Sequence, residues 1–87
     1  MTVRTADDGT IVLEGRCAVE DAETLVRLLL RAPAATVDWR DCDHAHTAII
    51  QILMAARPAM RGPPRSIQLR HWIEPVLAGA SVLPSAD

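Results

Sequence analysis

The chain has 87 residues, 49% of them hydrophobic, and a formal net charge of −2 at neutral pH. This length suits one small domain, residues 1–87, with enough apolar side chains for a buried core. The near-neutral charge lacks the basic excess that neutralises a phosphate backbone, so nucleic acid is not an expected partner. The longest apolar run, residues 48–56, is far shorter than the roughly twenty residues of a membrane span.

The two cysteines, Cys17 and Cys42, are too few for a disulfide scaffold in a chain of this size. No apolar stretch follows the first four residues, so a signal peptide is not expected either. We therefore predict a cytoplasmic protein with two reduced thiols and no segment inserted into a membrane.

The N-terminal part of the chain predicts a β-hairpin followed by a helix. Residues 2–5 alternate weakly and residues 10–13 form a β-branched run, with an Asp-Gly turn signal between them. We expect two antiparallel strands, the second closed by Gly15. Val19 to Arg31 then predict an amphipathic helix, because apolar residues recur at helical spacing, acids crowd the first turn and arginines the last.

The middle of the chain predicts a strand, a polar connection and an apolar helix. Residues 36–39 are typical of a strand inside a sheet, and residues 40–46 are dense in Asp and His. From Thr47 the chain is almost wholly apolar, and its Met-Ala-Ala ending favours a helix that continues to about residue 60. The Gly-Pro-Pro sequence at residues 62–64 breaks it.

The C-terminal part predicts a further strand and a short helix. Residues 66–70 alternate as a strand does, and residues 72–78 suit a helix with Gly79 as its C-cap. Residues 81–83 add either a last strand or only a cover for the core. Strands that alternate with helices imply parallel pairs and right-handed crossovers. The predicted fold class is therefore α/β, a small mixed sheet of about four strands with about three helices packed mainly on one side.

This order of elements resembles the STAS domain (sulfate transporter and anti-sigma-factor antagonist) over about residues 2 to 80. In that family the apolar helix opens with Asp-Ser-Ala-Gly or Asp-Thr-Ala-Gly, where this chain has His46-Thr47-Ala48-Ile49. The other matching motifs are residues 11–15 in the second strand, residues 37–39 in the central strand, residues 66–69 and residues 72–77.

The resemblance implies regulation by protein binding. Thr47 corresponds to the residue that a partner kinase phosphorylates in the family, and a phosphate at a helix N-terminus need not disrupt the fold. The alternative is that Thr47 only caps its helix. The predicted partner-binding residues are Asp41, Asp43, His44, His46, Thr47 and Ile50.

The resemblance also implies the kind of partner. We expect an anti-sigma-factor kinase or a comparable switch protein. The alternative is that this chain resembles the small STAS subunit of an ABC-type phospholipid transport system. Its partner would then be the ATPase of the transporter, which such a subunit stabilises. Weak homodimerisation is a further option.

Residues 41–46 contain Cys, Asp and His, the side chains that bind zinc. A structural zinc site normally draws on a second ligand cluster, and His71 is the only other histidine, so no metal is expected. Cys42 with His44 or His46 would make a thiol nucleophile and its base, but no orienting third group is evident. We therefore predict no enzyme and no cofactor, with a small metal- or thiol-dependent enzyme as the outside alternative, and a buried Cys42.

Trp39 and Trp72 are the only aromatic residues. Trp39, in the predicted central strand, is expected in the core. Trp72 suits either the core or an interface, where tryptophan commonly anchors a partner.

Overall fold

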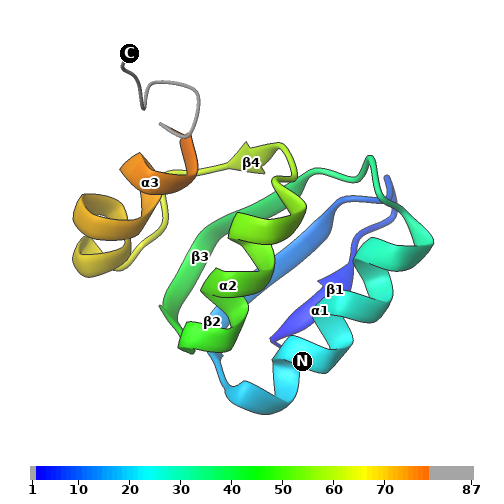
Figure 1. The fold of residues 1–87 in the computed structure, drawn as a ribbon, viewed down its shortest axis with the longest axis horizontal. Coiled ribbons are helices and arrows are strands. Elements are labelled where there is room, and N and C mark those ends of the chain that lie inside the picture. The colour runs from blue at the N-terminus through cyan, green and yellow to red at the C-terminus, as the bar shows by residue number, and fades with distance from the viewer. Residues whose placement is uncertain (1, 79–87) are drawn as a thin grey trace.

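The computed structural model describes residues 2–78, which form a four-stranded sheet with helices over one of its faces (Figure 1). The strands lie in the order β1-β2-β3-β4, with β1 antiparallel to β2 and the other two pairs parallel. The predicted α/β fold class is confirmed. The elements are β1 (Val3–Thr5), β2 (Ile11–Cys17), α1 (Val19–Arg31), β3 (Val37–Ala45), α2 (Thr47–Ala56), β4 (Met60–Arg61), a π-helical segment η1 (Leu69–Ile73) and α3 (Glu74–Ala78).

The N-terminal hairpin forms as predicted, with Val3 paired to Leu13. The carboxylate of Asp8 accepts a hydrogen bond from the backbone N–H of Thr10 at 3.0 Å, and Gly9 takes the positive φ of 91° that the turn requires. The prediction that Gly15 closes the second strand is wrong. Gly15 adopts a φ of 70° at a register shift, and pairing with β3 resumes beyond it to the end of β2.

Helix α1 has the predicted bounds because its signals are local. The carboxylate of Asp21 accepts a hydrogen bond from the backbone N–H of Ala18 at 2.8 Å, which satisfies a group at the helix start. Leu25 and Leu29, one turn apart, point into the core.

Strand β3 is much longer than its predicted four residues, so the predicted polar connection over residues 40–46 is wrong. Register shifts in the pairing with β2 carry it as far as the pair Cys17 and Ala45. Cys42 and Ala45 point into the core, while Asp43 and His44 between them are exposed. Asp41, Asp43 and His44 therefore lie on a strand and not in a loop.

Helix α2 ends at Ala56 rather than near residue 60. Arg57 takes the left-handed conformation (φ 51°) and donates its backbone N–H to the Leu53 carbonyl at 2.8 Å, and Pro58 follows. The chain released there forms the fourth strand, with Met60 paired to Val37.

The strand predicted over residues 66–70 is wrong, because the chain is helical from Ile67 onward. The Ser66 hydroxyl accepts a hydrogen bond from the Leu69 backbone N–H at 3.3 Å, as a helix N-cap does. Residues 69–73 of this C-terminal helix are π-helical, and the backbone N–H of Glu74 donates to the Leu69 carbonyl, five residues earlier. Predicted features at Gly79 and residues 81–83 lie outside the described residues.

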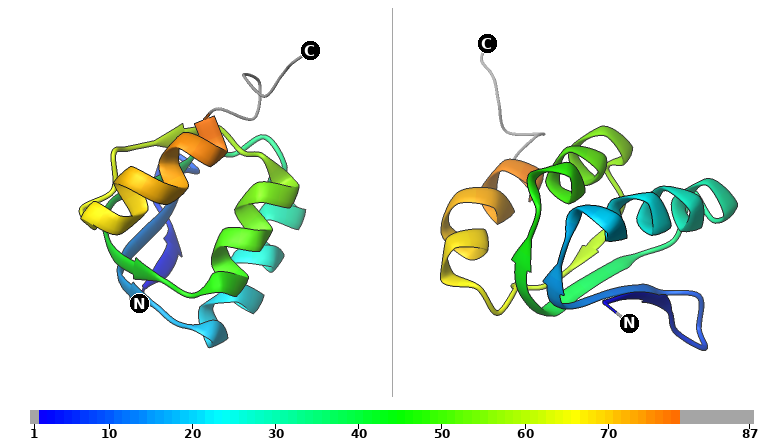
Figure 2. Two further views of the ribbon diagram at one scale, coloured as in Figure 1. Left: turned by 60° about the vertical axis from the view of Figure 1, so that its left-hand side comes forward. Right: turned by 90° about the horizontal axis from the view of Figure 1, so that it is seen from below.

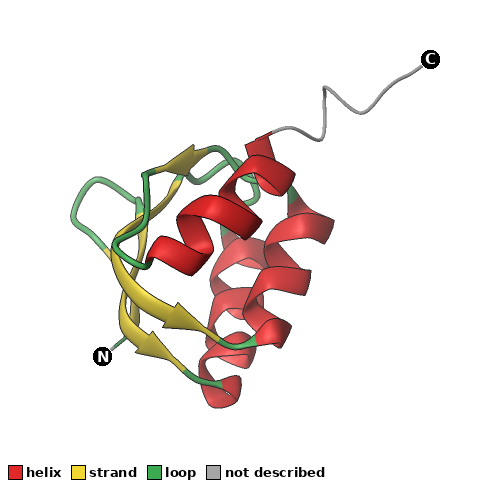
Figure 3. Cartoon of the chain, turned by 90° about the vertical axis from the view of Figure 1, so that its left-hand side faces the viewer, coloured by secondary structure: helices red, strands yellow, loops and turns green. Residues whose placement is uncertain are grey.

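Figures 2 and 3 show the helices layered on one face of the sheet, and the core residues lie in both layers. Trp39 is fully buried there, as predicted, and Cys42 is fully buried too. The core also includes Ile11, Leu13, Leu25, Ile49 and Leu53, all exposed by 1% or less.

The sheet also carries ion pairs between strand side chains. Arg4 contacts Glu14 at 2.8 Å, and Arg40 contacts Asp38 at 2.8 Å. Hydrogen bonds from the Arg40 side chain hold the pKa of Asp38 below its ordinary value. In residues 2–78, no helix combines the length and the apolar character needed to cross a membrane.

Candidate functional site

A hollow of about 370 Å³ lies where the end of β3, the start of α2 and the C-terminal helix meet. We call it the Trp72 hollow. Three of the six predicted partner-binding residues, His44, Thr47 and Ile50, line it. Its remaining lining residues are Ala45, Ser66, Gln68, Leu69, Trp72 and Ile73.

Thr47 is the first residue of α2 and its side chain is exposed at this hollow. The helix is capped by the preceding residue, because the Nδ1 atom of His46 accepts a hydrogen bond from the backbone N–H of Ala48 at 3.0 Å. The interpretation of Thr47 as an N-cap is therefore wrong. His46 has a structural task at the helix start and does not line the hollow.

Trp72 is 74% exposed, so it belongs to the surface and not to the core. Ile50, on the facing helix, is 8% exposed and joins the hollow to the hydrophobic core. A large exposed aromatic side chain beside an apolar surface is the composition of a protein-binding anchor. The interface interpretation of Trp72 fits its position.

Asp41 and Asp43 do not line the Trp72 hollow. Both contact Arg65, whose guanidinium lies 3.1 Å from an Asp41 carboxylate oxygen and 3.4 Å from one of Asp43. All three side chains are exposed, and such surface pairs contribute little stability. The predicted partner-binding set is thus divided between the hollow and this separate charged cluster.

The sequence did not predict that the C-terminal helix forms one side of the Trp72 hollow. Ser66, Gln68 and Trp72 were assigned to a strand and a later helix, whereas one helix carries the last two. The signal was available: Leu69, Ile73 and Leu77 recur at helical spacing and pack on the core.

The outside alternatives are a metal enzyme and a thiol enzyme that uses Cys42 with His44 or His46. In residues 2–78, no three His, Cys, Asp or Glu side chains lie close enough together to hold a metal ion. A hydrogen bond with Cys42, together with burial, raises the pKa of the Cys17 thiol. The same bond lowers the pKa of Cys42, but that sulfur belongs to a fully buried residue.

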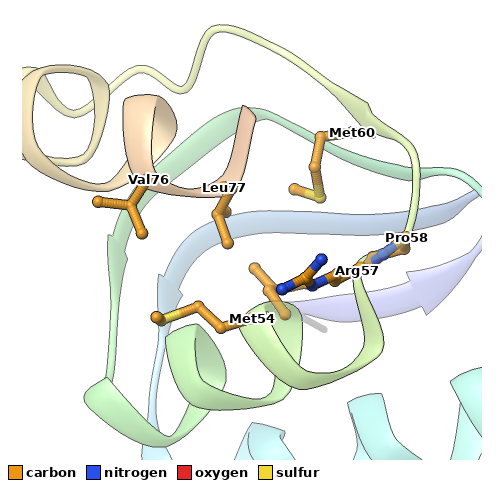
Figure 4. A pocket seen from close by; sticks show the side chains of 7 residues that line it. Met54, Arg57, Pro58, Met60, Val76 and Leu77 are labelled. Carbon is orange, nitrogen blue, oxygen red and sulfur yellow. The ribbon is translucent and has the colours of Figure 1, made fainter. Parts of the chain in front are cut away.

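A smaller hollow of about 160 Å³ lies between the end of α2 and α3 (Figure 4). Figure 4 shows the Arg57 side chain extending among apolar side chains, including Met54, Met60 and Leu77. None of the predicted site residues lines this hollow. It therefore does not compete with the Trp72 hollow as the predicted site.

No protein-family model, no curated protein and no solved structure matches this chain. The class established by the fold is a small α/β domain with a mixed sheet. Any functional assignment has to come from the residues at its surface.

Proposed function

We propose that this protein is a regulatory protein-binding domain of the STAS type, which binds a switch partner at the Trp72 hollow and releases it when Thr47 is phosphorylated. The observation that carries the proposal is the exposed Thr47 side chain at the rim of an apolar hollow that also presents Trp72. The protein acts in the cytoplasm by binding, without a catalytic group of its own.

The shape and composition of the hollow support protein binding. Leu69 and Ile73 from one helix face Ile50 from another, so a partner side chain that enters is surrounded by apolar atoms. Trp72 supplies a large contact area at little cost in conformational entropy. His44, Ser66 and Gln68 provide hydrogen-bonding groups at the same hollow, which allow one partner to be distinguished from another.

The position of Thr47 supports a phosphorylation switch. A phosphate there would meet the N-terminus of a ten-residue helix whose first turn contains no acidic residue. The helix dipole and the backbone N–H groups of that turn favour the new negative charge, so the fold tolerates it. A charge of about −2 at the rim would oppose an apolar partner by desolvation.

The architecture supports the STAS assignment in a general way. The mixed sheet, the helices over one face and an apolar helix that begins at Thr47 agree with the family pattern that the sequence resembles. We propose an anti-sigma-factor kinase or a comparable switch protein as the partner. In the alternative, the ATPase of a phospholipid transporter occupies the same hollow and Thr47 serves as a constant contact.

The test is affinity purification of the tagged protein from its native host, followed by mass spectrometry of the bound proteins. We expect a small ATP-binding kinase or anti-sigma factor, lost with Thr47→Glu and retained with Thr47→Ala. Recovery of transporter ATPase and permease subunits with both variants would instead establish the alternative.

A second comparison tests the hollow itself. Trp72→Ala should weaken the recovered complex about 30-fold, the usual effect of removing a tryptophan anchor. Ile67→Ala is the matched control, because Ile67 is 68% exposed on the same helix but does not line the hollow. Equal binding of the partner by Trp72→Ala and Ile67→Ala would show that the partner does not bind at the Trp72 hollow.

A further inference from the structure

Helix α1 exposes a stripe of apolar side chains on the flank of the molecule. Val19, Val26 and Leu30 are 52%, 38% and 76% exposed. Their spacings of seven and four residues put them on one face of the helix, apart from Leu25 and Leu29, which point into the core. In the right-hand view of Figure 2, α1 lies at one end of the helical layer, next to α2, so among residues 2–78 no helix lies on its outer side.

A groove of about 430 Å³ lies between α1 and α2, and two residues of the stripe, Val26 and Leu30, line it. We call it the α1–α2 groove. Ala55 and Ala56 on α2 are small and leave the space open. The apolar surface of the stripe therefore continues into the groove. The remaining lining residues are Leu29, Pro33 and Ile52.

The charges along α1 indicate what covers the stripe. Its exposed acids, Glu20 and Glu23, lie in the N-terminal half, and its exposed arginines, Arg27 and Arg31, lie in the C-terminal half. In an antiparallel pair of α1 helices centred near Leu25, the middle residue of the helix, each acid lies opposite an arginine of the other copy. A parallel pair would instead align like charges, which is unfavourable.

We propose that a second copy of this chain docks on the apolar stripe of α1, forming an antiparallel two-fold dimer. Leu30 of each copy packs against Val19 of the other. Glu23 pairs with the partner's Arg27, and Glu20 pairs with the partner's Arg31. The Trp72 hollow is lined by other residues and stays open, so this inference goes beyond the proposed function and does not depend on it.

The test measures the molar mass of the purified chain by analytical ultracentrifugation, over concentrations from micromolar to millimolar. We expect a reversible dimer for the natural sequence and a monomer for Leu30→Glu. Ile67→Glu is the control, because it places the same charge at an equally exposed apolar position outside the stripe and groove. It should dimerise like the natural sequence.

A charge exchange then tests the antiparallel register. Glu23→Arg alone and Arg27→Glu alone should each weaken the dimer about tenfold, because each places like charges opposite one another. The double variant Glu23→Arg/Arg27→Glu should restore it. Circular dichroism of each variant at low concentration shows whether α1 still forms in the monomer.

Three results would overturn the proposal. The first is a natural chain that stays monomeric at every concentration. The second is a dimer that Leu30→Glu leaves intact. The third is a double charge variant that dimerises no better than the single ones. If the natural chain is monomeric and Leu30→Glu loses a protein recovered from the native host, the stripe serves a different partner.

Discussion

Two hollows of similar size lie beside the same helix, yet they are lined by different kinds of residue. The Trp72 hollow, of about 370 Å³, includes His44, Thr47, Ser66 and Gln68 among its lining residues. The α1–α2 groove, of about 430 Å³, is lined entirely by apolar residues. One surface therefore presents hydrogen-bonding groups, including the hydroxyl of Thr47, and the other presents only shape and hydrophobic area.

The difference follows from helix α2, whose only polar side chains are Thr47 and Gln51. A helix that is apolar nearly all round needs cover on more sides than one sheet face provides. At its start, the polar end of β3 and the C-terminal helix give partial cover and bring polar groups with them. Along its other side, α1 gives partial cover with apolar residues. The first surface suits a regulated partner, and the second suits a copy of the same chain.

The largest expected effect separates the core part of one hollow from the surface part of the other. Ile50→Ala should lower the free energy of unfolding by about 2 to 5 kcal/mol, because Ile50 is nearly buried and its truncation leaves a cavity. Leu30→Ala, at the exposed edge of the groove, should change it by about 0.5 kcal/mol or less. Urea denaturation at low protein concentration measures both. Similar losses of unfolding free energy for the two variants would mean that Leu30 is as important to the core as Ile50.

The next largest effect concerns the C-terminal helix, which lines the Trp72 hollow and not the α1–α2 groove. Ser66→Ala removes the cap of the C-terminal helix and should cost about 1 kcal/mol. Hydrogen exchange should accelerate at residues 67–78 and stay unchanged in α1. Ser66→Asp keeps a capping oxygen and should restore slow exchange. Equal acceleration in both helices would show that the C-terminal helix is not a separate unit.

A further prediction concerns the pH dependence of stability. The residues lining the two hollows include no carboxylate, and Asp38, the group tested here, lines neither of them. The pKa of Asp38 is lower in the folded state than in the unfolded state, where it is about 3.9. The stability it contributes is therefore present above that value and is lost as pH falls through the folded pKa. Asp38→Asn should remove about 1 kcal/mol or less of this pH dependence, measured by thermal unfolding between neutral pH and pH 3. If Asp38→Asn left the pH dependence of the thermal midpoint unchanged, the lowered pKa of Asp38 would be contradicted.

The smallest effect separates the two residues at the start of α2. His46→Ala should lower stability by about 0.5 kcal/mol, because it removes the acceptor that caps the Ala48 N–H. Thr47→Ala should leave the thermal midpoint nearly unchanged. A larger loss for Thr47→Ala would mean that Thr47 has a structural role in addition to its place at the hollow.

The sequence predicted the parts of the molecule whose signals are local. The Asp-Gly turn indicated the hairpin, and the charge order of α1 indicated its bounds. The Gly-Pro-Pro sequence follows β4 and does not end the apolar helix, which stops at Ala56. Buried positions for Trp39 and Cys42 also followed from their places in an apolar pattern. Of the predicted site residues, His44, Thr47 and Ile50 line one hollow because they are neighbours along one strand–helix connection.

The tertiary structure decided the rest, because the deciding contacts join residues far apart along the chain. Pairing with β2 made residues 40–45 a strand despite their polarity, and pairing with Val37 made Met60 part of the fourth strand. Packing on the core made residues 67–70 helical, although their alternation is typical of a strand. That helix places Trp72 at the same hollow as Thr47, and no local sequence pattern predicts this proximity. Local sequence signals determine where an element starts and stops. The free energy of burying apolar surface is gained only when distant elements pack together, and this free energy determines which elements come into contact.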